Sequence, residues 1–424
     1  MAFRVQKLVG QVQAGLLAPQ PVSSMGSIGA KSPDDVVVVS ALRTPIGRAK
    51  KGIFKDTMPD DLLKAVLEGV VEQTGIDAKE VGDVMVGNVQ LGGAYAGPAR
   101  MAQLRAGFPV DVPIHSVNRQ CSSGLQAVAH VANAIKGGMI DVGIGAGVES
   151  MTQGGGPMDG APPPINLDEL MANSLAKDCL IPMGVTAENV AARYGVTRQE
   201  QDQMGVDSHA KALAAQAAGK FKAEIVGVPV TITDEKGEEK QVVMYDDDGP
   251  RATTLEGLAK LKTVFKKEGG TVTAGTASQV SDGAAAVLMM RRSKAESLGL
   301  KPIGAYRGAK VVGCAPDEMG VGPAVAIPPA LEAAGLKMED IDVFEINEAF
   351  AAQAAYCVKK LGVPVEKLNP NGGAIALGHP LGCTGARQVA TLLSELKRAG
   401  KTLGVVSMCI GTGMGMAAVF EAEH

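Results

Sequence analysis

The chain has 424 residues, a length that accommodates two or three domains. Hydrophobic residues make up 46% of it and charged residues 20%, so the composition predicts a packed core and excludes a wholly disordered chain. The 41 basic and 45 acidic residues give a net charge of −4 with no block of one sign, which excludes a nucleic-acid surface. Apolar runs are short, so we expect no membrane span.

The six cysteines contain no Cys-x-x-Cys pair, and their spacing gives no disulfide framework. The five histidines contain no His-x-x-x-His pair, so we expect no metal site. A reduced intracellular compartment fits this cysteine usage. The glycine patterns of NTPases and of dinucleotide-binding folds are also missing from the sequence.

Residues 1–33 form a segment that the sequence sets apart from the fold. They contain Arg4, Lys7 and Lys31 but no acidic residue, and they precede the first strand pattern. We expect a targeting or processed segment, with an unstructured terminus as the alternative.

Strand and helix patterns alternate from about Asp35 onward. Val36–Ser40 has the continuous apolar pattern of a buried strand, Asp60–Thr74 has apolar residues at helical spacing, and Val84–Val86 is typical of a short strand. This alternation predicts an α/β fold with parallel strands covered by helices.

A weak internal repeat divides the chain. Cys121–Ser150 and Gly385–Gly411 each have the pattern of a helix followed by a strand, and they align at an offset of 261 positions. The coinciding residues include Gly124 with Gly385, Val128 with Val389, and Ala129 with Ala390. Shared length and phase favour two related halves, with chance similarity between two helix–strand units as the alternative.

Residues 151–270 differ from both halves in composition. The segment 153–166 is rich in glycine and proline, and the helix patterns Ala187–Tyr194 and Gln199–Ala218 carry more charge. We expect an inserted loop domain here. The N-terminal half would then comprise residues 34–150 and 271–300, and the C-terminal half residues 301–424. Such insertions often form ligand surfaces.

Cys121 is the leading candidate for a catalytic nucleophile. It lies in Asn118–Gly124, directly before a predicted helix, where the positive end of the helix dipole would lower the pKa of the thiol. Its small neighbours leave room for a substrate. A buried structural cysteine is the alternative.

Three further residues could supply acid, base or oxyanion chemistry. His379 lies in Gly378–Gly382, where a permissive backbone could present an imidazole base, although a lone histidine is also commonly structural. Cys409 ends an apolar strand, and the glycines after it leave N–H groups free for an oxyanion hole. Asn347, at a strand-to-helix junction, could hold a water or a carbonyl, or could cap the helix.

Together these motifs resemble those of the thiolase family, most closely its peroxisomal 3-ketoacyl-CoA branch. The resemblance runs from about Asp35 to the end of the chain, with five motifs in the expected order. They are Arg43–Gly47, Asn118–Gly124, Asn347–Phe350, Gly378–Gly382 and Cys409–Gly413. The resemblance implies an α/β thiolase fold in which two similar halves form a five-layer αβαβα core. It also implies a homo-oligomer, expected to be a dimer, without metal or redox cofactor.

The resemblance further implies an acyltransferase of β-oxidation, which cleaves a 3-ketoacyl-CoA with CoA to acetyl-CoA and a shortened acyl-CoA. His379 would take the proton of Cys121, whose thiolate would attack the 3-keto carbon and carry the acyl group as a thioester. Cys409 would protonate the departing acetyl-CoA carbanion. One oxyanion would lie near His379 and a water held by Asn347. The other would lie near the backbone N–H groups of Cys121 and Gly411.

Coenzyme A, a substrate in this scheme, would bind across the insertion. Arg251 would approach its nucleotide phosphates. The pantetheine path would be lined by Met183, Phe265, Ala274, Ser278, Ala349 and Phe350. This chain has Pro182-Met183 where biosynthetic acetoacetyl-CoA thiolases have His-Met, and Gly257 where they have serine. The Pro-Met form resembles the degradative enzymes, and a biosynthetic thiolase is the alternative function.

Residues 1–33 also resemble a peroxisomal type-2 targeting signal. Arg4-Val5, five residues and then Gln11-Val12 follow its spacing, although Val12 departs from the usual leucine or alanine. The resemblance implies recognition by a peroxisomal import receptor, and a mitochondrial signal is the alternative.

Two rival functions share features of this sequence. Ketosynthases have the same fold and act on carrier proteins, but they pair their cysteine with two histidines, whereas Cys409 occupies the second position here. A non-catalytic acyl-CoA-binding protein would have no need of the reactive side chains of Cys121, His379 and Cys409.

Overall fold

The computed structural model describes residues 26–154, 165–233 and 237–424. The N-terminal half begins with β1 (Val36–Arg43), β2 (Gly47–Arg48), α2 (Pro59–Thr74), β3 (Asp83–Gly87), α3 (Ala96–Arg105), β4 (Ile114–Val117), α4 (Ser123–Lys136) and β5 (Val142–Ser150). The inserted segment contains α5 (Leu167–Ala172), α6 (Ser174–Asp178), α7 (Met183–Tyr194), α8 (Arg198–Ala217), β6 (Val228–Thr233), β7 (Glu239–Met244) and α9 (Leu255–Ala259).

The N-terminal half is completed by β8 (Ser281–Arg291) and α10 (Arg292–Ser297). The C-terminal half contains β9 (Gly304–Gly313), α11 (Gly322–Ala333), β10 (Val343–Ile346), α12 (Ala351–Leu361), α13 (Ala374–Leu377), α14 (Leu381–Ala399), β11 (Leu403–Ile410) and β12 (Met414–Ala422). The strand and helix patterns predicted near residues 36, 60, 84, 187 and 199 are all confirmed.

The two halves have the same strand topology. In the first, β3 pairs in parallel with β5, β5 pairs antiparallel with β8, and β8 pairs antiparallel with β1. In the second, β10, β11, β12 and β9 repeat this order and these directions. Short antiparallel pairing of β1 with β9 joins the halves into one sheet. The repeat is confirmed, because the 261-residue offset superimposes β5 on β11, which hold the same place in each half.

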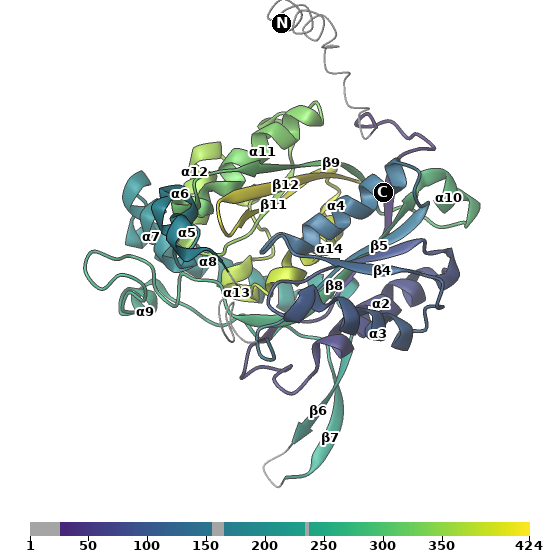
Figure 1. Cartoon of the computed structure of the whole chain (residues 1–424), viewed down its shortest axis with the longest axis horizontal. Helices are drawn as coiled ribbons and strands as arrows, with labels where there is room; N and C mark the ends of the chain where they lie inside the picture. Colours follow the sequence, from purple (N-terminus) through teal and green to yellow (C-terminus); the bar gives the residue numbers. More distant parts are fainter. Residues whose placement is uncertain (1–25, 155–164, 234–236) are drawn as a thin grey trace, which may run out of the picture.

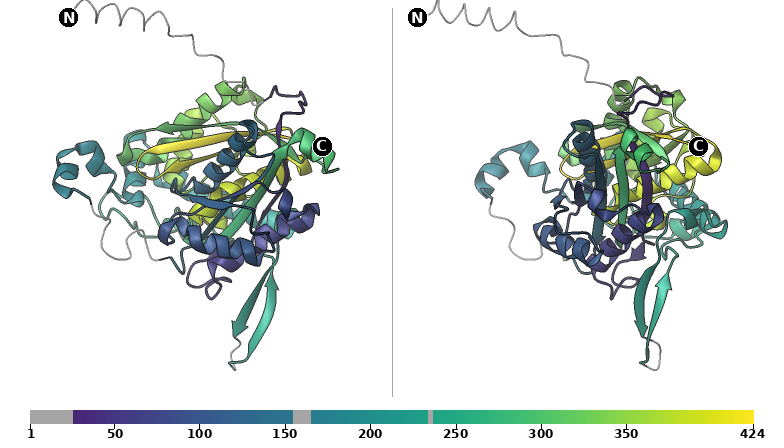
Figure 2. Two further views of the ribbon diagram at one scale, coloured as in Figure 1. Left: turned by 45° about the vertical axis from the view of Figure 1, so that its right-hand side comes forward. Right: turned by 90° about the vertical axis from the view of Figure 1, so that its right-hand side faces the viewer.

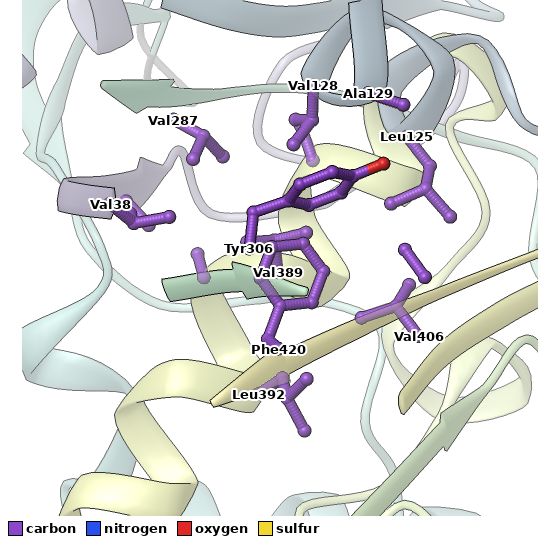
Figure 3. Close-up of a cluster of buried hydrophobic side chains, with 14 of the residues drawn as sticks. Val38, Leu125, Val128, Ala129, Val287, Tyr306, Val389, Leu392, Val406 and Phe420 are labelled. Atoms are coloured by element: carbon purple, nitrogen blue, oxygen red, sulfur yellow. The ribbon is translucent and has the colours of Figure 1, made fainter. Parts of the chain in front are cut away.

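The sheet folds back on itself around two central helices. Figure 1 shows α4 and α14 between the strands of the two halves, with α2 and α3 on one outer face and α11 and α12 on the other. The central layer contributes a large apolar surface to the core: Leu125 and Val128 of α4 and Val389 and Leu392 of α14 lie in one buried cluster with strand residues (Figure 3). Tyr306 and Phe420 pack edge to face within this cluster, with their ring centroids 5.6 Å apart. These are the five layers expected from the sequence.

The central helices approach each other at two glycines. A Cβ on Gly124 would lie 2.6 Å from the carbonyl oxygen of Gly382 and 2.9 Å from the amide nitrogen of Ala386. A Cβ on Gly385 would collide with the backbone of Leu125. The repeat superimposes these glycines, so each helix supplies one to the same crossing. The crossing places the beginning of α4, which follows Cys121, against the beginning of α14.

The insertion is fixed to the core by a buried arginine. Arg43, at the end of β1, binds both carboxylate oxygens of Asp247 at 2.7 and 2.9 Å and one of Glu224 at 2.7 Å. All three side chains are inaccessible to solvent. The motif Arg43–Gly47 therefore has a structural function at its first residue. Farther out, the hairpin of β6 and β7 projects from the body of the molecule (Figures 1 and 2).

The predicted targeting segment extends too far. Gly29 donates its N–H to Glu421 at 2.8 Å, and Arg307 donates to the carbonyl of Ala30 at 3.2 Å. Ile28 packs against the outer core of the C-terminal half. Residues 26–33 thus belong to the fold, because these contacts fix their backbone. The signal-like residues from Arg4 to Val12 lie outside the described residues, as do residues 155–164 of the predicted irregular segment.

Within the described ranges, every helix is too short or too polar to traverse a lipid bilayer.

Replacement of Gly124 by alanine tests the crossing of the central helices. We expect Gly124→Ala to reduce stability by about 1–3 kcal/mol, because the new methyl group must push two helix backbones apart. Gly97→Ala is the matched control, since Gly97 lies in α3 with open space where a Cβ would be. Thermal unfolding should give a lower midpoint for Gly124→Ala and an unchanged or slightly higher one for Gly97→Ala. Equal midpoints would contradict the tight crossing.

Candidate active site

A strained turn between β4 and α4 presents the sulfur of Cys121. The preceding residue, Gln120, has φ 47°, in the left-handed region that few side chains adopt. Its N–H donates to Asn118 Oδ1 at 2.8 Å, its carbonyl accepts from Ser123 Oγ at 2.7 Å, and its side chain donates to Thr412 Oγ1 at 3.0 Å. The motif Asn118–Gly124 therefore serves to hold this turn.

The thiol of Cys121 is protonated in the resting site. Only 9% of the residue is exposed, and burial raises the pKa of the thiol to about 11. The backbone N–H groups of Gly411 and of Cys121 itself favour the thiolate, but they do not outweigh burial. Backbone N–H groups thus lower this pKa as the sequence predicted, but removal of the sulfur from water dominates, and the net pKa is raised. Cys121 needs a base to become a nucleophile.

His379 is held in one tautomer by the residues that follow it. Thr384 Oγ1 donates its single proton to the carbonyl of Pro380 at 3.2 Å, so it can only accept from His379 Nδ1, 2.6 Å away. This assignment from the hydrogen-bond pattern puts the ring proton on Nδ1. Nε2 keeps its lone pair and accepts from Asn347 Nδ2 at 3.3 Å. His379 is thus arranged as a base.

The imidazole of His379 is also neutral. Burial lowers its pKa to about 3, and the positive charge of Arg387 acts in the same direction. At rest, the site therefore contains a neutral base, His379, together with the neutral thiol of Cys121.

Asn347 does not cap a helix. α12 begins only at Ala351, after Phe350 at its N-cap position, and no side chain caps it. Instead, Asn347 Nδ2 faces His379, and its Oδ1 is buried without a hydrogen-bond partner among the described residues. A buried oxygen of this kind is satisfied by a water.

Cys409 lies behind the cavity wall, at the end of β11. It is fully buried against Met319 and Ala349, and burial raises the pKa of its thiol well above the usual value. The sulfur donates to Gln353 Oε1 at 3.5 Å. Proximity to Cys121 raises the same pKa further, so the two sulfurs share one environment.

Glu149 connects the loops around the two reactive groups, and sequence reasoning missed it. This fully buried carboxylate accepts from the N–H of Gly382, next to the His379 turn, at 3.0 Å. It also accepts from the N–H groups of Val89 and Gln90 and from the side chain of Asn88, at 3.0–3.1 Å. Burial raises its pKa to about 7. An acid within the apolar run of β5 was the signal that could have found it.

A cavity of about 590 Å³ opens onto Cys121 and His379, within the size range of small-molecule sites. Its lining includes all six residues predicted for the pantetheine path: Met183, Phe265, Ala274, Ser278, Ala349 and Phe350. The rings of Phe265 and Phe350 meet edge to face at 5.8 Å, and the N–H of Ser278 donates to the carbonyl of Ala349 at 2.9 Å. These residues therefore form one wall beside the reactive groups.

Arg251 lies outside this lining. It is exposed, and its N–H donates to His209 Nδ1 at 3.3 Å. Arg48, by contrast, lines the cavity together with Lys51. Partial burial lowers the pKa of Arg251, and the charge of Arg48 acts in the same direction. Three cationic side chains thus gather at this side of the cavity, and sequence reasoning found only Arg251. The signal for the other two was their position directly after the motif Arg43–Gly47.

Comparison with known proteins shows the family of the chain that carries this site. The models of the thiolase N-terminal and C-terminal domains match residues 36–293 and 300–422. The chain is 57% identical over 422 residues to 3-ketoacyl-CoA thiolase B, peroxisomal, of Mus musculus, covering 97% of this chain and 98% of that protein. It is 59% identical over 393 residues to 3-ketoacyl-CoA thiolase 2, peroxisomal, of Arabidopsis thaliana, covering 92% and 84%.

Comparison with solved structures gives the same family. The crystal structure of the dimeric peroxisomal thiolase of Saccharomyces cerevisiae superimposes with a TM-score of 0.87 at 49% identity, covering 93% of this chain and 99% of that one. Family models, sequence relatives and structure agree over nearly the whole length. The chain therefore belongs to the thiolase family.

Proposed function

We propose that this chain is an acyltransferase that cleaves a 3-ketoacyl-CoA with CoA, giving acetyl-CoA and an acyl-CoA shortened by two carbons. The observation that carries the proposal is the pairing of a protonated Cys121 with a neutral His379, whose Nε2 is unprotonated, on the wall of one cavity. The names of the mouse and Arabidopsis relatives agree with this reaction.

In the first half-reaction, His379 Nε2 takes the proton of Cys121. The thiolate attacks the 3-keto carbon, and the N–H groups of Cys121 and Gly411, which face the sulfur at rest, stabilise the oxyanion. The Cα–Cβ bond then breaks, and the acyl group remains on Cys121 as a thioester. Protonated His379 and a water on Asn347 Oδ1 stabilise the thioester enolate of the leaving acetyl-CoA. Cys409 donates the proton that converts it to acetyl-CoA.

In the second half-reaction, CoA attacks the acyl thioester. Cys409, now a thiolate, takes the proton of the CoA thiol and returns to its resting form. The CoA sulfur forms the new thioester as Cys121 leaves as a thiolate, and Cys121 then recovers its proton from His379. Each charge forms together with its opposite, which offsets part of the cost of ionising buried groups.

The residues around the cavity suit a CoA thioester. Met183, Phe265 and Phe350 offer an apolar path for pantetheine, while Arg48, Lys51 and Arg251 supply positive charge for phosphates. Pro182-Met183 favours a degradative enzyme over one restricted to acetoacetyl-CoA. A thiolysis assay across acyl chain lengths distinguishes the two, since a biosynthetic enzyme would act only on the shortest substrate.

We further propose a homodimer that works in the peroxisome. The yeast relative is dimeric, and β4 is an edge strand of the sheet in the described part of the chain, available for pairing with a second copy. The relatives are named peroxisomal, and Arg4–Val12 has the spacing of an import signal. Mass measurement in solution tests the dimer.

Cys121→Ser tests the nucleophile. We expect it to abolish thiolysis, because a serine hydroxyl buried beside His379 is far harder to ionise than a thiol. Intact-mass measurement after incubation with an acyl-CoA should show one acyl group on the wild type and none on the variant. Full activity of the variant, or a label on another cysteine, would refute the assignment.

Cys409→Ala separates acylation from turnover. Because Cys121 and His379 are retained, some acylation of Cys121 should still be detected by intact mass. Steady-state thiolysis should fall by about 10²–10⁴-fold, the usual contribution of a positioned acid or base. Turnover close to the wild-type rate would remove Cys409 from the mechanism.

Arg4→Ala tests the import signal. We expect the tagged variant to remain in the cytosol of cells, because the basic residue begins the spacing that the import receptor would recognise. Lys7→Ala, between the two halves of the signal, serves as the control and should enter peroxisomes. Unchanged peroxisomal imaging of Arg4→Ala would exclude this signal, and mitochondrial fluorescence would favour the alternative.

A further inference from the structure

We propose that Gln353 is a positioning residue for Cys409: its side-chain amide holds the thiol proton of Cys409 between turnovers and connects this acid to the Asn347 loop. The inference rests on the proposed function, in which Cys409 is the proton donor and acceptor. It concerns a residue in the first turn of α12 that does not line the cavity.

Hydrogen bonding determines the orientation of the Gln353 amide. Gln353 is fully buried, and its Nε2 donates to the backbone carbonyl of Asn347 at 3.4 Å. That carbonyl can only accept, so the NH₂ group must face it and Oε1 must face the other way, toward Cys409 at 3.5 Å. The amide cannot rotate by 180° without placing two acceptors against each other.

This orientation specifies the protonation state of Cys409. An amide oxygen can only accept, so it stabilises the thiol and repels the thiolate. Burial is the largest influence that raises the pKa of Cys409; the thiols of Cys121, Cys357 and Cys314 raise it further, and the backbone N–H of Cys409 itself lowers it. Two carboxylates act on thiols of this set, Glu318 on Cys314 and Glu149 on Cys121. Gln353 is therefore the polar side chain that accepts from the Cys409 thiol in the described structure.

The amide has a defined part in each half-reaction. When acetyl-CoA leaves, the S–H bond of Cys409 breaks, its proton forms a C–H bond with the carbanion, and the sulfur becomes a thiolate beside Gln353 Oε1. That arrangement is unfavourable, so the thiolate takes the proton of the incoming CoA thiol and the hydrogen bond to Gln353 forms again. No oxidant, reductant or further reactant is needed.

The link to Asn347 distinguishes this amide from ordinary core packing. Asn347 Nδ2 contacts His379, while its backbone carbonyl accepts from Gln353. The side chain of Gln353, in α12, thus connects Cys409 to the loop that carries Asn347, whose own side chain contacts the base His379. A change at Gln353 should alter proton transfer while leaving the cavity wall in place.

Gln353→Met and Gln353→Glu test the proposal in opposite ways. Methionine keeps the length of the side chain but neither hydrogen bond. We expect kcat for thiolysis to fall about tenfold at every pH, the effect of one ordinary hydrogen bond, with KM for CoA unchanged. A protonated glutamic acid reproduces both bonds, since its O–H donates to Asn347 and its C=O accepts from Cys409.

Gln353→Glu should therefore be active only while its carboxyl is neutral. Burial raises the pKa of Glu149 to about 7 and that of Glu345 to about 8, and a carboxyl at position 353 should titrate in the same range. We expect kcat near the wild-type value at a pH of about 6. Relative to wild type, it should fall at least about tenfold by a pH of about 9, because the carboxylate cannot donate to Asn347.

Two controls and one fallback make the outcome decisive. Gln103→Met, in α3, removes another buried amide, which donates to the carbonyls of Val112 and Pro113 and accepts from Arg100, and should leave kcat unchanged. The rate at which iodoacetamide alkylates Cys121 reports an intact site in each variant. If Gln353→Met does not fold, the ratio of Gln353→Glu to wild type across pH decides alone.

Wild-type kcat in Gln353→Met, or a ratio for Gln353→Glu that does not change with pH, would overturn the inference. Cys409→Ala, assayed in parallel, distinguishes this from failure of the proposed function. If Cys409→Ala turns over normally, the mechanism itself is wrong and the inference falls with it. If Cys409→Ala is inactive and the Gln353 variants behave like wild type, only the role of Gln353 is refuted.

Discussion

The close approach of α4 and α14 determines where the reactive groups lie. Gly124 and Gly385 let the backbones of the two helices meet near their beginnings without side chains between them. Cys121 precedes one helix and His379 the other, so two residues that are far apart in the chain share one cavity. Glu149 completes the arrangement, because it binds the N–H of Gly382 and the loop that follows β3 at the same time. The fold thus assembles the site from both halves of the repeat.

Burial governs the chemistry of this site. It keeps the thiols of Cys121 and Cys409 protonated and the imidazole of His379 neutral, so no isolated charge lies on the reactive atoms at rest. The same low dielectric strengthens each interaction that forms once a proton moves, including those of the N–H groups facing Cys121. A site of this kind depends on paired proton transfers rather than on a thiolate formed in advance, because burial of Cys121 outweighs the backbone N–H groups that favour its thiolate.

Sequence reasoning reached the features that are encoded locally. The apolar runs of β1, β5 and β11 and the apolar faces of α4 and α14 predict the core, and the repeat predicts its symmetry. Cys121, His379 and Cys409 stand out because small, permissive residues surround them. By contrast, Glu149 and Gln353 depend on partners that folding brings to them, from 233 residues away in the case of Glu149 and Gly382. The boundary of the expected targeting segment was missed for the same reason, since Gly29 and Ala30 bind Glu421 and Arg307, residues far away in the sequence.

Two backbone carbonyls determine the tautomer of His379 and the orientation of the Gln353 amide. The carbonyl of Pro380 takes the only proton of Thr384, which forces His379 to carry its proton on Nδ1 and to leave Nε2 free. The carbonyl of Asn347 takes the NH₂ of Gln353, which turns the amide oxygen toward Cys409. A carbonyl oxygen accepts hydrogen bonds at every pH. The tautomer of the base, His379, and the orientation of the amide beside the acid, Cys409, are therefore set by groups that do not titrate. Asn347 belongs to both arrangements, through its side chain to His379 and its carbonyl to Gln353. A shift of that one loop would therefore disturb the nucleophile's base and the carbanion's acid together, which ties the two half-reactions to a single structural element.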